Sequence, residues 1–363
     1  MLGRLMADVR RLVWLVRVMR RRGYSLPAIV ACHVPVTVAG RAYGKLARTL
    51  NARGPLRAIN RARFAAFQDA HRDRLGGHYY VIVMPGTLHF LRPCLDRLPG
   101  HLAVFLVSNG ARPWERARLR AEYAHLPMAV LATLPGSSLV HGDAINLMLD
   151  HNASDFGILD HDLYLFDPAI FERARPAADE CAFALFSEVS RRTGRRYPET
   201  YFLHFNRAVL RALSDRYGID ARLYRRAPPR AAARLASLGR PESLLRKDTQ
   251  DFLDTLQLLF ALAEVDGVPV RIDTAADDAD AVHVGGTSMG THRTKELAQL
   301  YVHRRFIDLA GDAEITRRYA HVTEPLATAA EIRARMHPSL EEWRIADRVD
   351  RLIERLQAAR CVS

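Results

Sequence analysis

The sequence predicts an α/β fold in which helices flank a mostly parallel sheet. Runs rich in β-branched and aromatic residues, typical of buried strands, recur four times in the first half of the chain. Segments of helical composition separate these runs, and this alternation implies parallel pairing of the strands. The strand-like runs are 79–84, 101–110, 128–134 and 156–166, and the segments between them are 92–98, 113–126 and 136–152.

The second half of the chain is less regular. Residues 197–213 indicate a strand that runs into a helix, and residues 248–267 form a strong helical pattern that stops at Gly267. Two short strands are expected after it, and surface helices are expected towards the end of the chain. These segments are 268–272, 281–286 and 325–360.

The positive charge lies in one part of the chain. The formal net charge is +13, and residues 1–75 hold sixteen Lys and Arg residues against three Asp residues. The remainder therefore carries equal numbers of basic and acidic residues. Nucleic-acid binding usually needs basic residues interleaved with aromatic ones, a pattern that the five aromatic residues of this segment do not make. We expect no nucleic-acid partner.

The first 22 residues have the pattern of a basic amphipathic helix. Leucine, methionine and valine recur at helical spacing, and Arg20, Arg21 and Arg22 close the segment. Such a helix lies on an anionic membrane surface or packs its apolar side on the protein, and the sequence leaves both interpretations open. Residues 23–40 are uncharged but contain Pro27 and Pro35, which argues against a membrane-spanning helix.

The chain is expected to stay in the cytoplasm, as a peripheral protein on the inner face of the membrane if the first helix binds lipid. Its start lacks the small-residue cleavage site of a secretory signal. The four cysteines form no CxxC pair, which excludes a zinc ribbon and suits a reducing compartment.

Two aspartates stand among apolar residues in the fourth strand-like run, FGILDHDLYLF. Asp160 and Asp162 are two residues apart, so on a strand both side chains point to the same face. Paired carboxylates at a strand end suit a hard divalent cation, Mg²⁺ or Mn²⁺. Such a cation bridges to phosphate oxygens and neutralises a diphosphate leaving group.

Four stretches together carry a resemblance to a known family. VIVMPGTL, LVSNG, HGDAIN and FGILDHDLYLF occur in the order found in the donor-binding half of GT-A glycosyltransferases, and the chain resembles the family 2-like members most. The resemblance implies a mixed, mostly parallel sheet and transfer of a sugar to an acceptor hydroxyl, with inversion. It implies a UDP-, GDP- or dTDP-sugar donor and a glycan or lipid-linked acceptor, as in cell-surface polysaccharide or glycoconjugate synthesis.

The same resemblance suggests a domain organisation. A basic helical segment at 1–75 precedes a GT-A catalytic domain at 76–323, and helices follow at 324–363. The donor half of the catalytic domain is expected at 76–210 and the acceptor half at 211–323.

The metal ligands are implied by the resemblance, position by position. Asp160 would contact the nucleotide ribose or the metal-bound diphosphate, and Asp162 would be the principal protein ligand. His283, in VHVGG, matches the downstream histidine that completes the coordination, with His292 as the second choice. The alternative for His283 is a strand histidine hydrogen-bonded in the core.

The nucleotide is expected to contact residues at strand and helix ends. Pro85, Gly86 and Thr87 follow the first strand and Asn109 follows the second, where this fold holds the base and ribose. The alternative for these residues is ordinary turn chemistry.

A second group of candidate nucleotide contacts begins a helix. Gly142, Asp143 and Asn146 lie in its first turns, and the free N–H groups at a helix N-terminus favour anions. Asp143 serves equally well as a helix cap.

The general base is expected before the helix of the acceptor half. Asp248 fits the position of the family's base, and Asp251 follows one turn later. The chain departs from the family here, because Lys247-Asp248 replaces an acidic pair. The departure leaves the base and the stereochemistry open, and Asp248 could instead cap the helix.

Two functions other than sugar transfer also fit parts of this sequence. A nucleotidyltransferase would also use a metal, but its sheet usually opens with a glycine-rich loop that carries Arg or Lys, whereas this chain has one glycine and the distant Arg92. A non-catalytic protein that binds a membrane surface through the basic segment is the other alternative.

Overall fold

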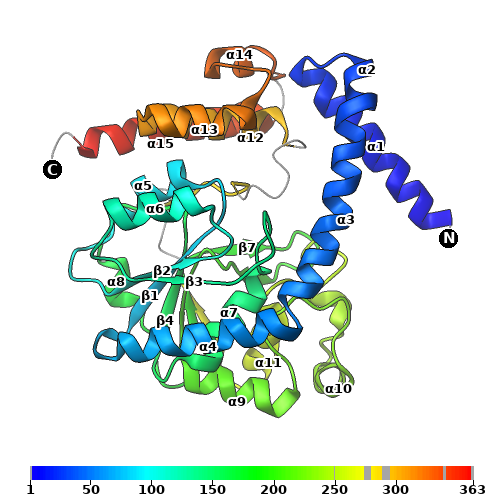
Figure 1. The fold of residues 1–363 in the computed structure, drawn as a ribbon. Coiled ribbons are helices and arrows are strands. Elements are labelled where there is room, and N and C mark those ends of the chain that lie inside the picture. Colours follow the sequence, from blue (N-terminus) through cyan, green and yellow to red (C-terminus); the bar gives the residue numbers. More distant parts are fainter. Residues whose placement is uncertain (1, 249, 274–278, 288–294, 338–340, 361–363) are drawn as a thin grey trace. The chain divides into compact units, whose positions relative to one another are not determined.

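The structure is a computed structural model that describes residues 2–248, 250–273, 279–287, 295–337 and 341–360 (Figure 1). The side chains of residues 2–11, 359 and 360 lie outside this description. The chain divides into two compact units. One comprises Met1–Ala47, Pro85–Asp96 and Val284–Ser363, and is called the helical unit below. The other comprises Arg48–Met84 and Arg97–His283, and is called the sheet unit.

A seven-stranded sheet forms the centre of the sheet unit. Its order is β10-β6-β9-β4-β1-β2-β3, and every strand except β9 runs in the same direction. The predicted α/β fold with a mixed, mostly parallel sheet is therefore confirmed. The strands are β1 (His78–Val83), β2 (Val104–Ser108), β3 (Met128–Val130), β4 (Phe156–Asp160), β6 (Ala182–Ala184), β9 (Phe202–Phe205) and β10 (Val270–Ile272).

Two small antiparallel pairs accompany this sheet. β5 (Leu163–Leu165) pairs with β11 (Ala281–His283), and β7 (Ser187–Val189) pairs with β8 (Arg196–Pro198). Because β5 follows β4 almost directly, the β5–β11 pair brings a distant part of the sequence next to the end of β4.

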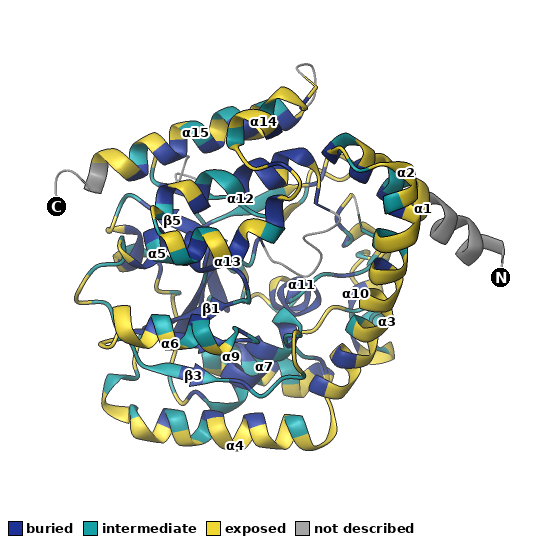
Figure 2. Ribbon diagram, turned by 45° about the horizontal axis from the view of Figure 1, so that its top comes forward, coloured by how far each residue is buried: buried dark blue, intermediate teal, exposed yellow. Residues whose placement is uncertain are grey.

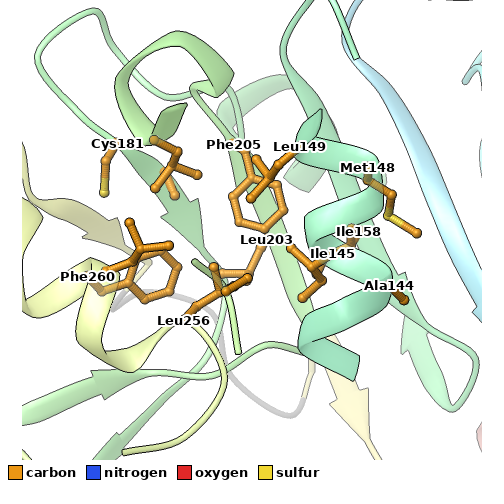
Figure 3. Packing of buried hydrophobic residues seen from close by; sticks show 14 of the residues in the cluster. Ala144, Ile145, Met148, Leu149, Ile158, Cys181, Leu203, Phe205, Leu256 and Phe260 are labelled. Carbon is orange, nitrogen blue, oxygen red and sulfur yellow. The ribbon is translucent and has the colours of Figure 1, made fainter. Parts of the chain in front are cut away.

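Helices supply the remaining core of the sheet unit. Ala144, Ile145 and Met148 of α7 are buried in one cluster with strand residues and with α11 (Figure 3). The helices of this unit are α4 (Gly54–Ala70), a 3₁₀ turn (Arg72–Arg74), α6 (Pro113–Glu122), α7 (His141–His151), α8 (Ile170–Arg173), α9 (Arg207–Tyr217), α10 (Pro229–Ala236), a 3₁₀ turn (Glu242–Leu244) and α11 (Gln257–Val265).

α11 is shorter than the sequence pattern predicts. The pattern covers 248–267, but the helix begins at Gln257. Leu253 pairs with Tyr224 through two backbone hydrogen bonds, and the Leu256 N–H donates to the Ala221 carbonyl. These tertiary hydrogen bonds replace the helical ones, so residues 250–256 form a loop that pairs with the segment Ala221–Tyr224.

The helical unit is built around α12. Helices α5, α13, α14, α15 and α1 contact it, and Leu297, Leu300 and Tyr301 of α12 lie in an apolar cluster with residues of the C-terminal helices. Its elements are α1 (Leu2–Arg22), α2 (Leu26–Ala28), a π-helix (Ile29–His33), α3 (Val34–Asn51), α5 (Leu88–Leu95), α12 (Leu297–Ala310), α13 (Ala313–Thr323), α14 (Ala329–Ala334) and α15 (Glu341–Arg360). The last residues of α3 fall in the sheet unit.

The described part of α1 packs on its own unit. Leu15 and Met19 are buried against Ile29, and Arg21 forms a bidentate ion pair with Glu342. Within the described residues, no helix is long and apolar enough to cross a bilayer.

Candidate metal and donor site

Three ligating side chains meet at the end of β4. Asp160 is the last residue of β4, and Asp162 follows in the turn that leads to β5. In the β5–β11 pair, His283 lies opposite Leu163, so the antiparallel register places it beside both aspartates. The His283 Nε2 atom is 3.3 Å from Asp162 Oδ1 and 3.8 Å from Asp160 Oδ2.

This group fits a divalent cation. One ligand atom from each of Asp160, Asp162 and His283 lies within 4.8 Å of the others, and Asp162 is only 2% exposed. Two carboxylates and an imidazole match the ligand preferences of Mn²⁺, and the carboxylates alone match those of Mg²⁺. These are the three residues named as metal ligands from the sequence and the resemblance, and their metal role stays a prediction; His292 lies outside the described residues.

The charges of the three groups are coupled. Burial, together with the charge of Asp162, raises the pKa of Asp160 to about 7, and His283 offsets part of this effect. Burial opposes the charge of His283, but its hydrogen bond to Asp162 and the nearby carboxylates raise its pKa above the ordinary value. In the absence of a metal, protons therefore supply the positive charge that these carboxylates need.

Tyr201 positions His283. Its ring stacks on the imidazole with 3.4 Å between ring centroids and 19° between the planes. The Tyr201 carbonyl accepts a hydrogen bond from the Asp160 N–H, which ties the approach to β9 to the end of β4. Burial and the neighbouring carboxylates, Glu199 first among them, raise the pKa of the Tyr201 hydroxyl.

A buried lysine lies next to this group. Lys247 Nζ is 2.7 Å from Glu199, 3.5 Å from Glu188 and 3.7 Å from Asp254. Burial raises the pKa of Glu199 despite Lys247, and the same carboxylates keep the pKa of Lys247 above its ordinary value although burial opposes its charge. Glu199 also contributes to the electrostatic field at Asp160 and His283. The lysine group and the metal-ligand group are therefore electrostatic neighbours.

A cavity of about 330 Å³ opens beside the lysine. Its charged lining comprises Glu199, Lys247 and Asp254 together with Arg195, Arg196 and Glu264, and Phe260 and Ile272 are among its apolar walls. A partly polar, partly apolar cavity of this size can hold a small organic molecule.

The predicted nucleotide contacts are distributed over both units. Pro85, Gly86 and Thr87 belong to the helical unit. In the sheet unit, the Asn109 amide donates to the Leu139 carbonyl and accepts from the Leu139 N–H, so it holds the loop before α7. Their nucleotide roles stay predictions.

The start of α7 packs closely on the loop around Ala221. Asn146 Oδ1 accepts from the Ala221 N–H, and a Cβ atom on Gly142 would lie 2.6 Å from the Ala221 carbonyl oxygen. Asp143 and Asn146 line a separate cavity of about 370 Å³, and burial raises the pKa of Asp143 although Arg222 opposes the shift. The nucleotide roles of Gly142, Asp143 and Asn146 stay predictions.

The predicted bases lie in the loop before α11. The Asp248 carboxylate accepts hydrogen bonds from the Ser190 hydroxyl and the Arg191 N–H, and these contacts lower its pKa. Asp251 is exposed. Asp254 lies closer to α11 and lines the cavity.

No motif in the sequence marks Glu199, Tyr201, Lys247 or Asp254 as functional. Lys247 was noted only as a departure from an acidic pair. That departure was a usable signal, because a lysine is seldom buried without carboxylate partners.

Comparison with known protein families identifies a glycosyltransferase domain in part of the chain. Residues 57–210 match the family described as the StrH glycosyltransferase N-terminal domain. The prediction of a GT-A-like glycosyltransferase, and hence of an enzyme, is confirmed. Asp160 and Asp162 lie inside the matched segment.

Solved structures show a more distant likeness. The mannosyltransferase PcManGT from Pyrobaculum calidifontis, solved with GDP-Man and Mn²⁺, is 12% identical, with 85% of this chain and 87% of that chain covered and a TM-score of 0.34. S. aureus TarS 1–349 is 13% identical, with 77% and 83% covered and a TM-score of 0.31. GlyE of Streptococcus pneumoniae TIGR4 is 13% identical, with 54% and 45% covered and a TM-score of 0.33. No curated protein matches the sequence significantly.

Mn²⁺ affinity is expected to fall as the pH drops from about 8 to about 6. The pKa of Asp160 is raised to about 7 and that of His283 is also raised, so both groups hold protons at the lower pH and must lose them to bind a cation. Calorimetric titration at several pH values, in buffers of different ionisation enthalpy, measures the affinity and the protons released. Asp179→Asn, which changes an exposed aspartate, should titrate like the unchanged protein. An affinity independent of pH would contradict this assignment.

Lys247→Met is expected to lower the free energy of unfolding by about 3 kcal/mol, because it leaves buried Glu199 without its cation. Adding Glu199→Gln should recover a large part of that loss, as a double-mutant cycle in chemical denaturation would show. Arg240→Met, which breaks the exposed pair with Glu264, is the matched control and should cost about 1 kcal/mol at most. Equal losses for the two single variants would contradict a buried charge network.

Proposed function

We propose that the protein transfers a sugar from a nucleotide-diphosphate sugar to an acceptor hydroxyl with the help of Mn²⁺ or Mg²⁺. The observation that carries this proposal is the group of Asp160, Asp162 and His283 at the carboxyl end of β4, in a chain with a glycosyltransferase domain. Ligands of α/β sheets bind at the carboxyl ends of the strands, which supports a donor site there.

Each ligand has a distinct part in the proposed reaction. Asp162, the most buried of the three, would be the principal metal ligand, and Asp160 would contact the metal-bound diphosphate or the ribose. Tyr201 holds the imidazole of His283 in the plane that directs its Nε2 atom at the aspartates. When bound, the cation would neutralise the diphosphate as it leaves.

The reaction also needs a base. The acceptor hydroxyl gives its proton to a carboxylate while its oxygen attacks the anomeric carbon, and the bond to the nucleoside diphosphate breaks. A single displacement of this kind inverts the anomeric centre. Asp248 and Asp251 are the bases expected from the sequence, but the contacts favour Asp254, which lines the cavity beside Glu199 and Lys247.

The cavity supports an acceptor site next to the donor site. Its charged lining suits hydroxyl groups, and Phe260 and Ile272 suit the apolar face of a sugar ring or a short aglycone. We propose a glycan or lipid-linked acceptor of the kind used in cell-surface polysaccharide or glycoconjugate synthesis, with a UDP-, GDP- or dTDP-sugar as the donor.

Asp162→Ala is expected to weaken Mn²⁺-dependent nucleotide binding. Calorimetry with UDP, GDP and dTDP, each with Mn²⁺ and with EDTA, should show binding of at least one nucleotide that requires the metal. Loss of the principal ligand should weaken this binding at least about tenfold, since even outer contacts of metal sites contribute that much. Asp179→Ala should leave it unchanged. If none of the three nucleotides binds with Mn²⁺, the proposed donor site is wrong.

Asp254→Asn is expected to lower kcat by about 10²–10⁴-fold without weakening nucleotide binding, because a base acts on the acceptor proton and not on the donor. Release of nucleoside diphosphate in the presence of a panel of glycan acceptors measures the rate. Asp248→Asn and Asp251→Asn are the matched controls. Loss of turnover in Asp248→Asn, with Asp254→Asn active, would restore Asp248 as the base.

A further inference from the structure

Exposed apolar side chains gather on a short part of the chain. Among the described residues, fifteen large hydrophobic side chains are exposed, and nine of them lie between Leu12 and Leu50. Figure 2 shows α3 drawn mostly in the colour of exposed residues. Single exposed apolar residues are common, but a cluster of them is not. The cluster in this segment therefore indicates a surface that binds another molecule.

On α3 the exposed apolar residues form a stripe. Val36, Ala39, Tyr43, Leu46 and Leu50 are spaced three and four residues apart and therefore share one side of the helix. The helix is anchored at its end, because the buried Asn51 side chain bonds to Ser137, Ser138 and Leu134. The stripe thus belongs to an anchored helix.

Apolar exposure extends beyond this stripe. Val38 is 55% exposed at another angle of α3, and Leu26 and Val30 are 50% and 57% exposed just before it. From Leu26 to Asn51 the α2, π and α3 segments follow one another without a break. Together, Leu26, Val30, Val36, Val38, Tyr43 and Leu46 are called the α3 ridge below.

The stretch of sequence that carries the ridge has charges of one sign only. Residues 9–68 contain thirteen Arg and Lys residues and no Asp or Glu. Arg41, Lys45 and Arg48 of α3 are exposed and lie away from the apolar stripe. A surface with this composition is complementary to an anionic partner.

We propose that the α3 ridge docks the protein on an anionic lipid surface. A basic helix with an exposed apolar side lies in the plane of the headgroups, with the apolar side inserted and the cations near lipid phosphates. A second copy of the chain fits less well, because residues 9–68 carry thirteen basic residues and no acidic one, so two copies of this segment would repel each other.

This proposal replaces α1 by α3 as the lipid-binding element. In the described part of α1, Leu15, Val18 and Met19 are buried within the helical unit. That side of α1 therefore packs on the protein and is not available to lipid. Docking is independent of the proposed reaction, and it holds or fails whatever the donor and acceptor are.

Co-sedimentation of the full chain with vesicles tests the docking. The protein should pellet with phosphatidylcholine vesicles that contain phosphatidylglycerol and stay in solution with phosphatidylcholine alone, and added salt should weaken the binding. The triple variant Val36→Asp, Tyr43→Asp, Leu46→Asp should lose binding. The matched control changes three exposed residues elsewhere, Val189→Asp, Leu238→Asp and Leu244→Asp, and should pellet like the unchanged protein.

A second triple variant tests the same docking if the three aspartate substitutions disturb folding. Arg41→Gln, Lys45→Gln and Arg48→Gln leave the apolar stripe intact and should weaken partitioning on the order of a hundredfold. Unchanged pelleting of both triple variants, or equal pelleting with neutral and anionic vesicles, would overturn the proposal. So would light scattering that shows a dimer of the unchanged protein, a monomer of the aspartate variant and no lipid binding by either.

Discussion

The structure depends most on the need to balance two carboxylates that the end of β4 holds close together. Asp160 and Asp162 lie where burial and mutual repulsion make simultaneous ionisation costly, and the raised pKa of Asp160 reflects that cost. The β5–β11 pair brings His283 to them, and the chain before β9 brings Tyr201 behind His283. These elements place partial or full positive charge where the carboxylates need it.

The charged residues around this site are also shared among several partners. Ion pairs link His283 to two carboxylates and Lys247 to three, so each cation is shared among several anions. This network contains more carboxylates than nearby cations, so it favours the binding of a further positive charge. A divalent metal ion would supply two positive charges at one position. Without a metal, repulsion among these carboxylates would lower the free energy of unfolding at neutral pH, and a bound metal ion would remove that repulsion. A site built this way gives up stability for affinity, as functional sites commonly do.

The sequence predicts those parts of this arrangement that follow from local pattern. Strand and helix alternation predicted the parallel core. Asp160 and Asp162 were recognised as a pair, although the strand ends at Asp160 and a turn, not a continuous strand, carries Asp162. The resemblance, and not the pattern, supplied His283, since its partner strand is more than a hundred residues away. Asp254 was missed because hydrogen bonds from Leu253 and Leu256 to the segment around Tyr224 hold residues before Gln257 out of the predicted helix. Such tertiary bonds leave no periodic signal.

The uneven distribution of charge along the chain bears on both the proposed reaction and the proposed lipid docking. If the net charge of +13 were spread over the whole chain, it would attract nucleotides and other polyanions without selection. Confined to residues 9–68 and their flanks, it can bind an anionic surface while the remaining chain stays neutral. In the proposed reaction, recognition of the diphosphate would depend on a metal held by Asp160, Asp162 and His283, an interaction that is directional and short in range. A basic docking helix and an acidic metal site are therefore compatible because they lie on different parts of the sequence.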